Sequence, residues 1–102
     1  MPIWSISSFR NRPNNQTTAL IGQVLSGNAK YQSIKLANNG KLYAVPRNAS
    51  KVLEIDPINQ TTALIGQDLG TASDKYIGLE LANNGKLYAC PYQASQVLEI
   101  NP

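Results

Sequence analysis

The stretch NNGKLYAVPRNASKVLEIDP, residues 38–57, returns almost unchanged as NNGKLYACPYQASQVLEINP at residues 83–102. A second shared stretch, NQTTALIGQ, precedes each of them, at residues 15–23 and again at residues 59–67. Agreement of this length and order does not arise by chance. The chain is therefore built from two tandem copies of one unit, and a unit of this size points to a repeat architecture.

This duplication divides the chain into a first repeat at residues 14–57, a second repeat at 58–102 and a preceding arm at 1–13. The arm matches the repeats poorly, and we interpret it as the degenerate end of an earlier repeat. It holds the only Trp and the only Phe of the chain, Trp4 and Phe9. These two side chains either anchor the arm on a neighbouring repeat or contact a ligand.

Each repeat is expected to form four short antiparallel strands. In the second copy, apolar residues alternate along Tyr76–Leu81, and Asn83–Gly85 follows with residues that tolerate a tight hairpin turn. The other expected strands are Lys86–Tyr92, Val97–Ile100 and Thr61–Gly66, the last of which follows the third strand of the first copy. Helical periodicity is absent over any longer window, so the pattern predicts an all-β chain.

The motif NGKLYA, at residues 39–44 and 84–89, resembles the second strand in tandem blade repeats of kelch-like and tachylectin-like propeller proteins. Many of those repeats carry an N-G-x-[LI]-Y-A core. The resemblance covers residues 14–102 and implies two four-stranded propeller blades. It implies no function, because such propellers bind very different partners. A sandwich or closed barrel is the alternative fold, although a tandem four-stranded unit is unusual there.

Two blades are too few to close a propeller, which takes about four to eight. We therefore expect a homo-oligomer: three chains give six blades, which we favour, and four chains give eight. The strand expected at 17–22 precedes the first blade, so we expect it to pair with 97–100 of the next subunit. The expected interface residues are Thr17, Leu20, Gly22, Val97, Leu98 and Ile100.

A candidate ligand site follows from where the two copies differ. In a propeller, the connections between the second and third strands and between the fourth and first strands share one face. The copies differ most in these connections, and such loops are common binding surfaces. Tyr92 with Gln93 and Asp68 suits a glycan, and Arg47 with Asn48 is the matching set in the first copy. Drift after duplication is the alternative explanation of the same differences.

Two further positions carry expectations about packing. Lys35 and Glu80 occupy the same place in the inner strand, where they either form ion pairs around the ring or remain unrelated solvated charges. Cys90 stands where the first copy has Val45, which predicts a small apolar core site. The tyrosines that recur in both copies are expected to pack rather than to bind; they are Tyr31, Tyr76, Tyr43 and Tyr88.

Composition disfavours several classes of function. The chain of 102 residues has a net charge of +3 without a basic run interleaved with aromatics, so nucleic acid is not an expected partner. No apolar run is long enough to span a membrane. Histidine is absent, which removes the usual catalytic base and metal ligand, so we expect no enzyme, no cofactor and no metal. No signal peptide is recognisable, and the default location is the cytosol, although a mature secreted chain would look the same.

These observations favour a non-catalytic, lectin-like ring that presents several equivalent glycan sites. The alternative is a structural or protein-interaction scaffold, which includes an amplified or engineered repeat fragment with no small ligand. A glycan screen separates the two.

Overall fold

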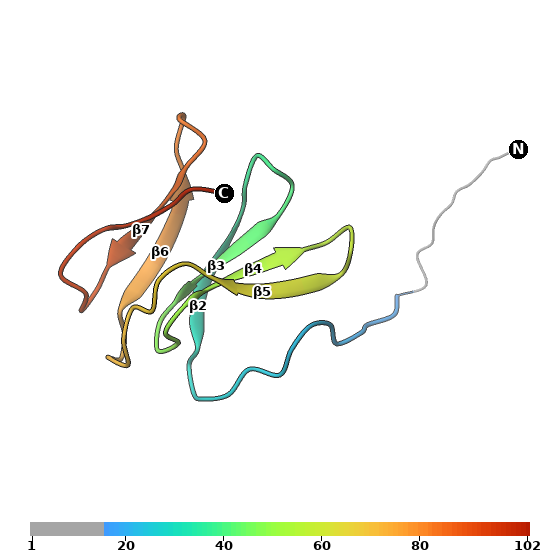
Figure 1. Cartoon of the computed structure of the whole chain (residues 1–102), viewed down its shortest axis with the longest axis horizontal. Coiled ribbons are helices and arrows are strands. Elements are labelled where there is room, and N and C mark those ends of the chain that lie inside the picture. Colours follow the sequence, from blue (N-terminus) through green and yellow to red (C-terminus); the bar gives the residue numbers. More distant parts are fainter. Residues whose placement is uncertain (1–15) are drawn as a thin grey trace, which may run out of the picture.

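The computed structural model describes residues 16–102, so the expected arm at 1–13, with Trp4 and Phe9, lies outside the described residues. The described part contains seven strands in two antiparallel sheets and no helix. The all-β prediction is therefore confirmed for this part of the chain. Figure 1 shows the two sheets next to each other, with the segment that leads into β2 extending to one side.

The first sheet has four strands in sequence order: β2 (Tyr31–Leu36), β3 (Leu42–Pro46), β4 (Val52–Asp56) and β5 (Thr61–Ile65). Each strand pairs antiparallel with the next along the chain. The expected fourth strand at 61–66 is confirmed as β5, which places Ile65 opposite Val52. The first sheet thus takes its outer strand from the start of the second repeat.

The second sheet has three strands: β6 (Tyr76–Leu81), β7 (Leu87–Pro91) and β8 (Leu98–Ile100). The fourth place expected of a complete blade is not filled by any described residue. Residues 17–22, which we expected as an outer strand, form no strand, and Leu20 is fully exposed. A strand needs a neighbouring backbone to pair with, and no described segment lies alongside these residues in a sheet.

The hairpins between the first two strands of each sheet use one device twice. Gly40 and Gly85 both have a φ of +84°, a left-handed conformation that glycine adopts without strain. The Asn39 Oδ1 accepts a hydrogen bond from Lys41 N at 2.9 Å, and the equivalent bond in the second sheet measures 3.0 Å. The shared Asn-Asn-Gly sequence therefore fixes the same turn in both repeats.

The turn from β4 to β5 is held by Asp56. Its Oδ1 accepts hydrogen bonds from the backbone N–H groups of Ile58 at 3.0 Å and Asn59 at 3.2 Å. These bonds favour the ionised carboxylate, so the pKa of Asp56 lies below its ordinary value. This turn reverses the chain at the edge of the sheets opposite the loops 47–51, 66–75 and 92–97.

The core lies between the two sheets, where β2 runs beside β6. Its buried side chains come from both repeats: Ala37, Tyr43, Val45, Val52, Tyr76, Leu79, Leu87, Ala89 and Ile100. The inner strands are also joined by an ion pair from Lys35 Nζ to Glu80 Oε1 at 2.6 Å. Of the two alternatives for these charges, the structure shows pairing between the two repeats of one chain.

Packing of the repeated tyrosines follows the prediction at two of the four positions most clearly, since Tyr43 and Tyr76 are buried. The Tyr43 hydroxyl donates to Glu54 Oε2 at 2.8 Å, and the Tyr76 hydroxyl donates to Gln96 O at 3.1 Å. The buried phenols thus have hydrogen-bond partners.

The expectation of a core site at Cys90 is wrong for the chain by itself, because Cys90 is exposed. Its counterpart Val45 is fully buried, at 0% exposure. The difference arises because the second sheet covers the face of the first sheet that holds Val45, while no described residues form a sheet over the corresponding face of the second.

Candidate binding site at the loop edge of the two sheets

Three loops meet at the edge of the sheets where β2 and β6 begin. They are residues 47–51, 66–75 and 92–97. Backbone hydrogen bonds join them: Leu69 N to Ser50 O at 2.7 Å, Lys75 N to Arg47 O at 2.8 Å and Tyr92 N to Lys75 O at 2.9 Å. The expected sharing of one edge by these connections is confirmed.

The side chain of Lys75 ties the longest of these loops to its neighbour. Lys75 is only 3% exposed, and its Nζ donates to Ala72 O at 2.7 Å and to Asn48 O at 3.3 Å. Burial lowers the pKa of Lys75, while the charge of Asp68 acts in the opposite direction. A buried ammonium held by two carbonyl groups fixes the loop in one conformation.

A cavity of about 480 Å³ opens between the two sheets at this edge. It is lined by residues of both repeats: Gln32, Arg47, Asp74, Ile77 and Tyr92. The Tyr92 side chain is 61% exposed and Ile77 is 44% exposed, so the cavity has an accessible aromatic ring and an apolar wall. A few polar groups set in a partly apolar hollow are typical of small-molecule sites.

An ion pair crosses this cavity from one repeat to the other. Arg47 Nε donates to Asp74 Oδ1 at 2.6 Å, and Arg47 Nη1 donates to Gln32 Oε1 at 3.4 Å. Because a guanidinium carries five N–H donors, these two bonds leave further donors for a ligand. The second carboxylate oxygen of Asp74 and the amide N–H groups of Gln32 add an acceptor and donors of fixed orientation.

The backbone around Asp74 is held in the conformation that this pair requires. Asp74 has a φ of 54°, in the left-handed region, and its N–H donates to Asn48 Oδ1 at 2.8 Å. Asn48 is held in turn, since its Nδ2 donates to Asn28 O at 3.0 Å. Asn48 therefore positions Asp74 and is not itself among the cavity-lining residues.

Two β-bulges place Gln32 and Ile77 at the cavity. In β2 the pairing with β3 shifts between Tyr31 and Ser33, and in β6 the equivalent shift lies between Tyr76 and Gly78. The extra residue of each bulge is Gln32 in the first sheet and Ile77 in the second. Bulges re-aim side chains and are common beside functional sites.

Only some of the ligand-binding residues predicted from the sequence line the cavity. Arg47 and Tyr92 line the cavity as expected, and Asn48 lies behind it. Gln93 donates from its backbone N–H to Asp74 O at 3.0 Å, and its side chain is not part of the lining. Asp68 is not in the lining either, because its Oδ1 accepts from Gly70 N at 2.8 Å within its own loop.

Sequence reasoning missed Gln32, Asp74 and Ile77 as lining residues. All three differ between the copies, where Gln32 aligns with Ile77 and Asp74 with Ala29. Asp74 lies in a connecting loop, as Arg47 and Tyr92 do, whereas Gln32 and Ile77 lie within β2 and β6. A bulge, however, cannot be recognised in a single sequence, and without it alternation does not place residues 32 and 77 at the cavity.

Within residues 16–102, no group of three His, Cys, Asp or Glu side chains is arranged to hold a metal ion. The same residues include no helix long and apolar enough to cross a membrane. Comparison of the chain with protein-family models, curated proteins and solved structures found no match. Function is therefore inferred from the geometry of the cavity itself.

Proposed function

We propose that the chain is a non-catalytic carbohydrate-binding module and that the cavity between its two repeats takes one sugar unit. The observation that carries the proposal is the meeting of an exposed aromatic ring, Tyr92, with the Arg47–Asp74 pair in one hollow. A sugar offers an apolar C–H face to stack on an aromatic ring and hydroxyl groups that bond to planar polar side chains. The lining of this cavity supplies both kinds of contact.

The two sheets are, in this proposal, blades of a propeller that several copies complete together. Three lines of observation support it. The strands form two antiparallel sheets, each in sequence order, and the first strands of the two sheets lie beside each other. The chain has only two such sheets among its described residues. Three copies make a ring of six blades, within the range of about four to eight that closes. Such a ring presents one Arg47–Asp74 cavity per chain, and repeated weak sites bind a multivalent glycan tightly.

The proposal is tested by a glycan array followed by calorimetric titration of the sugars that bind. Tyr92→Ala should weaken binding about tenfold, because an aromatic stack contributes about 0.5–1.5 kcal/mol beyond the area it buries. Arg47→Ala should weaken binding at least as much, since it also releases Asp74. Ile58→Ala is the matched control: Ile58 is 87% exposed and lies in the turn at the opposite edge.

Unchanged affinity in the Tyr92→Ala and Arg47→Ala double variant would remove this cavity as the glycan site. A scaffold function with no small ligand is the second candidate, and the exposed apolar residues Ile34, Leu36 and Val97 favour it by offering faces for protein partners. An intact oligomer that binds no glycan on the array would support that alternative.

A further inference from the structure

The two repeats act as internal controls for burial. Val45 and Val52, on the face of the first sheet that meets the second, are 0% and 5% exposed. Their counterparts on the second sheet are Cys90, which is exposed, and Val97, which is 62% exposed. Cys90 lies in β7 as Val45 lies in β3, and Val97 directly precedes β8 where Val52 begins β4. The first sheet packs against the second through the face that holds Val45 and Val52, and the corresponding face of the second sheet is exposed to solvent.

On the opposite face of each sheet, two side chains of the first sheet are more exposed than their counterparts in the second. Leu79 of the second sheet packs against the first sheet and is 9% exposed, whereas its counterpart Ile34 is 52% exposed. Leu36 is likewise 56% exposed, while its counterpart Leu81 packs against the core. On this face of the first sheet Ala44 and Leu53 are buried within the chain, so the exposed part is the region around Ile34 and Leu36. The chain therefore carries two different faces with exposed apolar side chains, and each corresponds to one side of the interface already formed between its own sheets.

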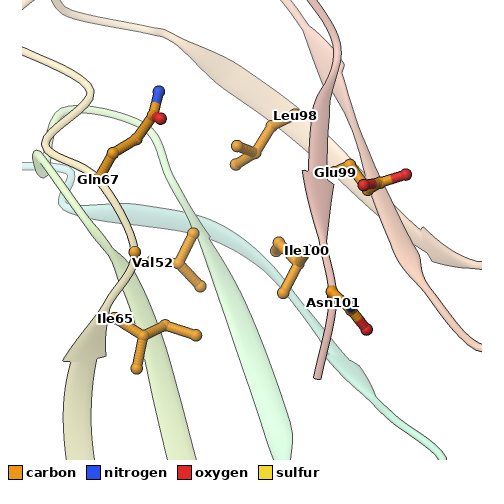
Figure 2. Close-up of a pocket in the computed structure, with 8 residues that line it drawn as sticks. Val52, Ile65, Gln67, Leu98, Glu99, Ile100 and Asn101 are labelled. Carbon is orange, nitrogen blue, oxygen red and sulfur yellow. The ribbon is translucent and has the colours of Figure 1, made fainter.

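A groove marks where a further strand fits beside β8. A cavity of about 550 Å³ separates the second sheet from the outer part of the first, and it is lined by Val52, Ile65, Gly66, Gln67, Leu98, Glu99, Ile100 and Asn101. Figure 2 shows Leu98 and Ile100 pointing across it toward Val52 and Ile65, while Glu99 points away. Among the described residues, β8 pairs only with β7, so its other edge is open to this groove.

The chain contains a segment with the sequence of the strand that fits there. TTALIG occurs at 61–66, where it forms β5, and at 17–22, where it pairs with nothing in the described chain. β5 pairs with β4, which begins with the sequence VLEI at residues 52–55. The same sequence recurs at residues 97–100, which include β8. Both TTALIG segments end in a left-handed glycine, with φ of +78° at Gly22 and +80° at Gly66. The backbone at the end of residues 17–22 therefore has the same conformation as the backbone that follows β5.

Residues 17–22 of the same chain lie on the wrong side of the first sheet to fill the groove. Gln23 N donates to Thr62 Oγ1 at 3.3 Å, and Val24 shares a hollow with Leu64. Leu64 and Thr62 alternate with Ile65, which faces the groove, so they point to the other face of β5. Figure 1 shows the segment leading into β2 on the far side of the first sheet from β6 and β7.

We propose that the two bare faces are the two halves of a head-to-tail interface between copies of this chain, and that residues 17–22 of one copy complete the second sheet of the next. The pairing of β4 with β5 gives the register, because Glu54 opposite Ala63 translates into Glu99 opposite Ala19. Leu20 then lies opposite Leu98 and points into the groove. A head-to-tail contact of this kind closes into a ring when its rotation permits. The inference rests on the proposed ring, not on the glycan site, and specifies its interface.

A disulfide between copies tests this register in the full chain. Cys90→Val removes the native thiol and restores the residue of the first repeat, and Ala19→Cys with Glu99→Cys then places one thiol on each strand. Directly opposite residues of antiparallel strands are close enough for a disulfide. Mild oxidation should give covalent multimers on a non-reducing gel. The matched control is Thr18→Cys with Glu99→Cys, shifted by one residue so that its side chains lie on opposite faces. It should give at least tenfold less product.

The inference is overturned if the 19/99 pair gives no multimers, if the shifted pair links equally well, or if oxidation joins the two thiols within one chain. These results are separate from glycan binding. A ring that links in this register but binds no sugar leaves the interface standing and removes the proposed function. A chain that binds sugar but forms no disulfide-linked multimers in this register overturns the interface and leaves the glycan site standing.

Discussion

Lys35 and Glu80 hold the same position in the two repeats, and their side chains form an ion pair 2.6 Å long between β2 and β6. The duplicated position has thus diverged to opposite charges that meet where the two sheets lie side by side. Had both repeats kept the same charge, the pair would repel. Divergence between the copies is in this case complementary, which separates it from neutral drift.

The pH dependence of this ion pair has a definite sign. The hydrogen bond from Lys35 lowers the pKa of Glu80 below its ordinary value of 4.5. A carboxylate with a lowered pKa contributes stability above its unfolded pKa and loses it as pH falls through the folded pKa. The melting temperature of the wild type should therefore exceed that of Glu80→Gln at neutral pH. The difference should begin to shrink near pH 4.5 and vanish only when the pH falls below the lowered pKa of the folded state. Because the side chain is exposed, the difference should also shrink in high salt. A difference that grows on acidification would contradict the role given to this pair.

Replacement of Lys75 by methionine tests the clamp on the loop edge. The substitution keeps the length of the side chain but removes the donors to Ala72 O and Asn48 O. Loss of the two hydrogen bonds of this buried ammonium should reduce the free energy of unfolding by about 1–3 kcal/mol, measured by urea denaturation at fixed protein concentration. Lys30→Met is the matched control, since Lys30 donates to Gly27 O at 2.8 Å at an exposed site. Its effect should stay within about 0.5 kcal/mol. Equal losses in the two variants would show that burial of Lys75 adds nothing.

Most strands follow directly from the sequence, because alternation and turn residues act locally. β6 has the predicted bounds of Tyr76–Leu81, and β5 ends one residue earlier than expected. Residues 17–22 have the same letters as β5 and form no strand. The deciding factor there is a partner backbone, which local sequence does not contain.

The candidate site was predictable in part for the same reason. Arg47 and Tyr92 were identified from differences between the copies, but Asp68 bonds within its own loop instead of reaching the cavity. Gln32 and Ile77 reach it through bulges that depend on pairing with the next strand. The sequence shows which side chains differ between the copies, but it does not show the β-bulges that direct Gln32 and Ile77 toward the cavity.

The reactivity of Cys90 reports on whether its sheet face is covered. In the chain alone this thiol is exposed, and the assembly proposed above buries it beneath the first sheet of another copy. Alkylation in the native protein should therefore be much slower than in a variant that lacks residues 1–23, which should yield monomers or aggregates. Full reactivity of the thiol in the native protein would show that this face is open.

The mass of the native protein tests the central claim most directly. One chain has a mass of 11.1 kDa, and native mass spectrometry should find an assembly of three such chains that carries all six sheets. Four chains would keep the closed ring and change its size. A folded monomer would contradict the assembly, because it would leave the bare faces around Ile34 and Val97 in water without a partner.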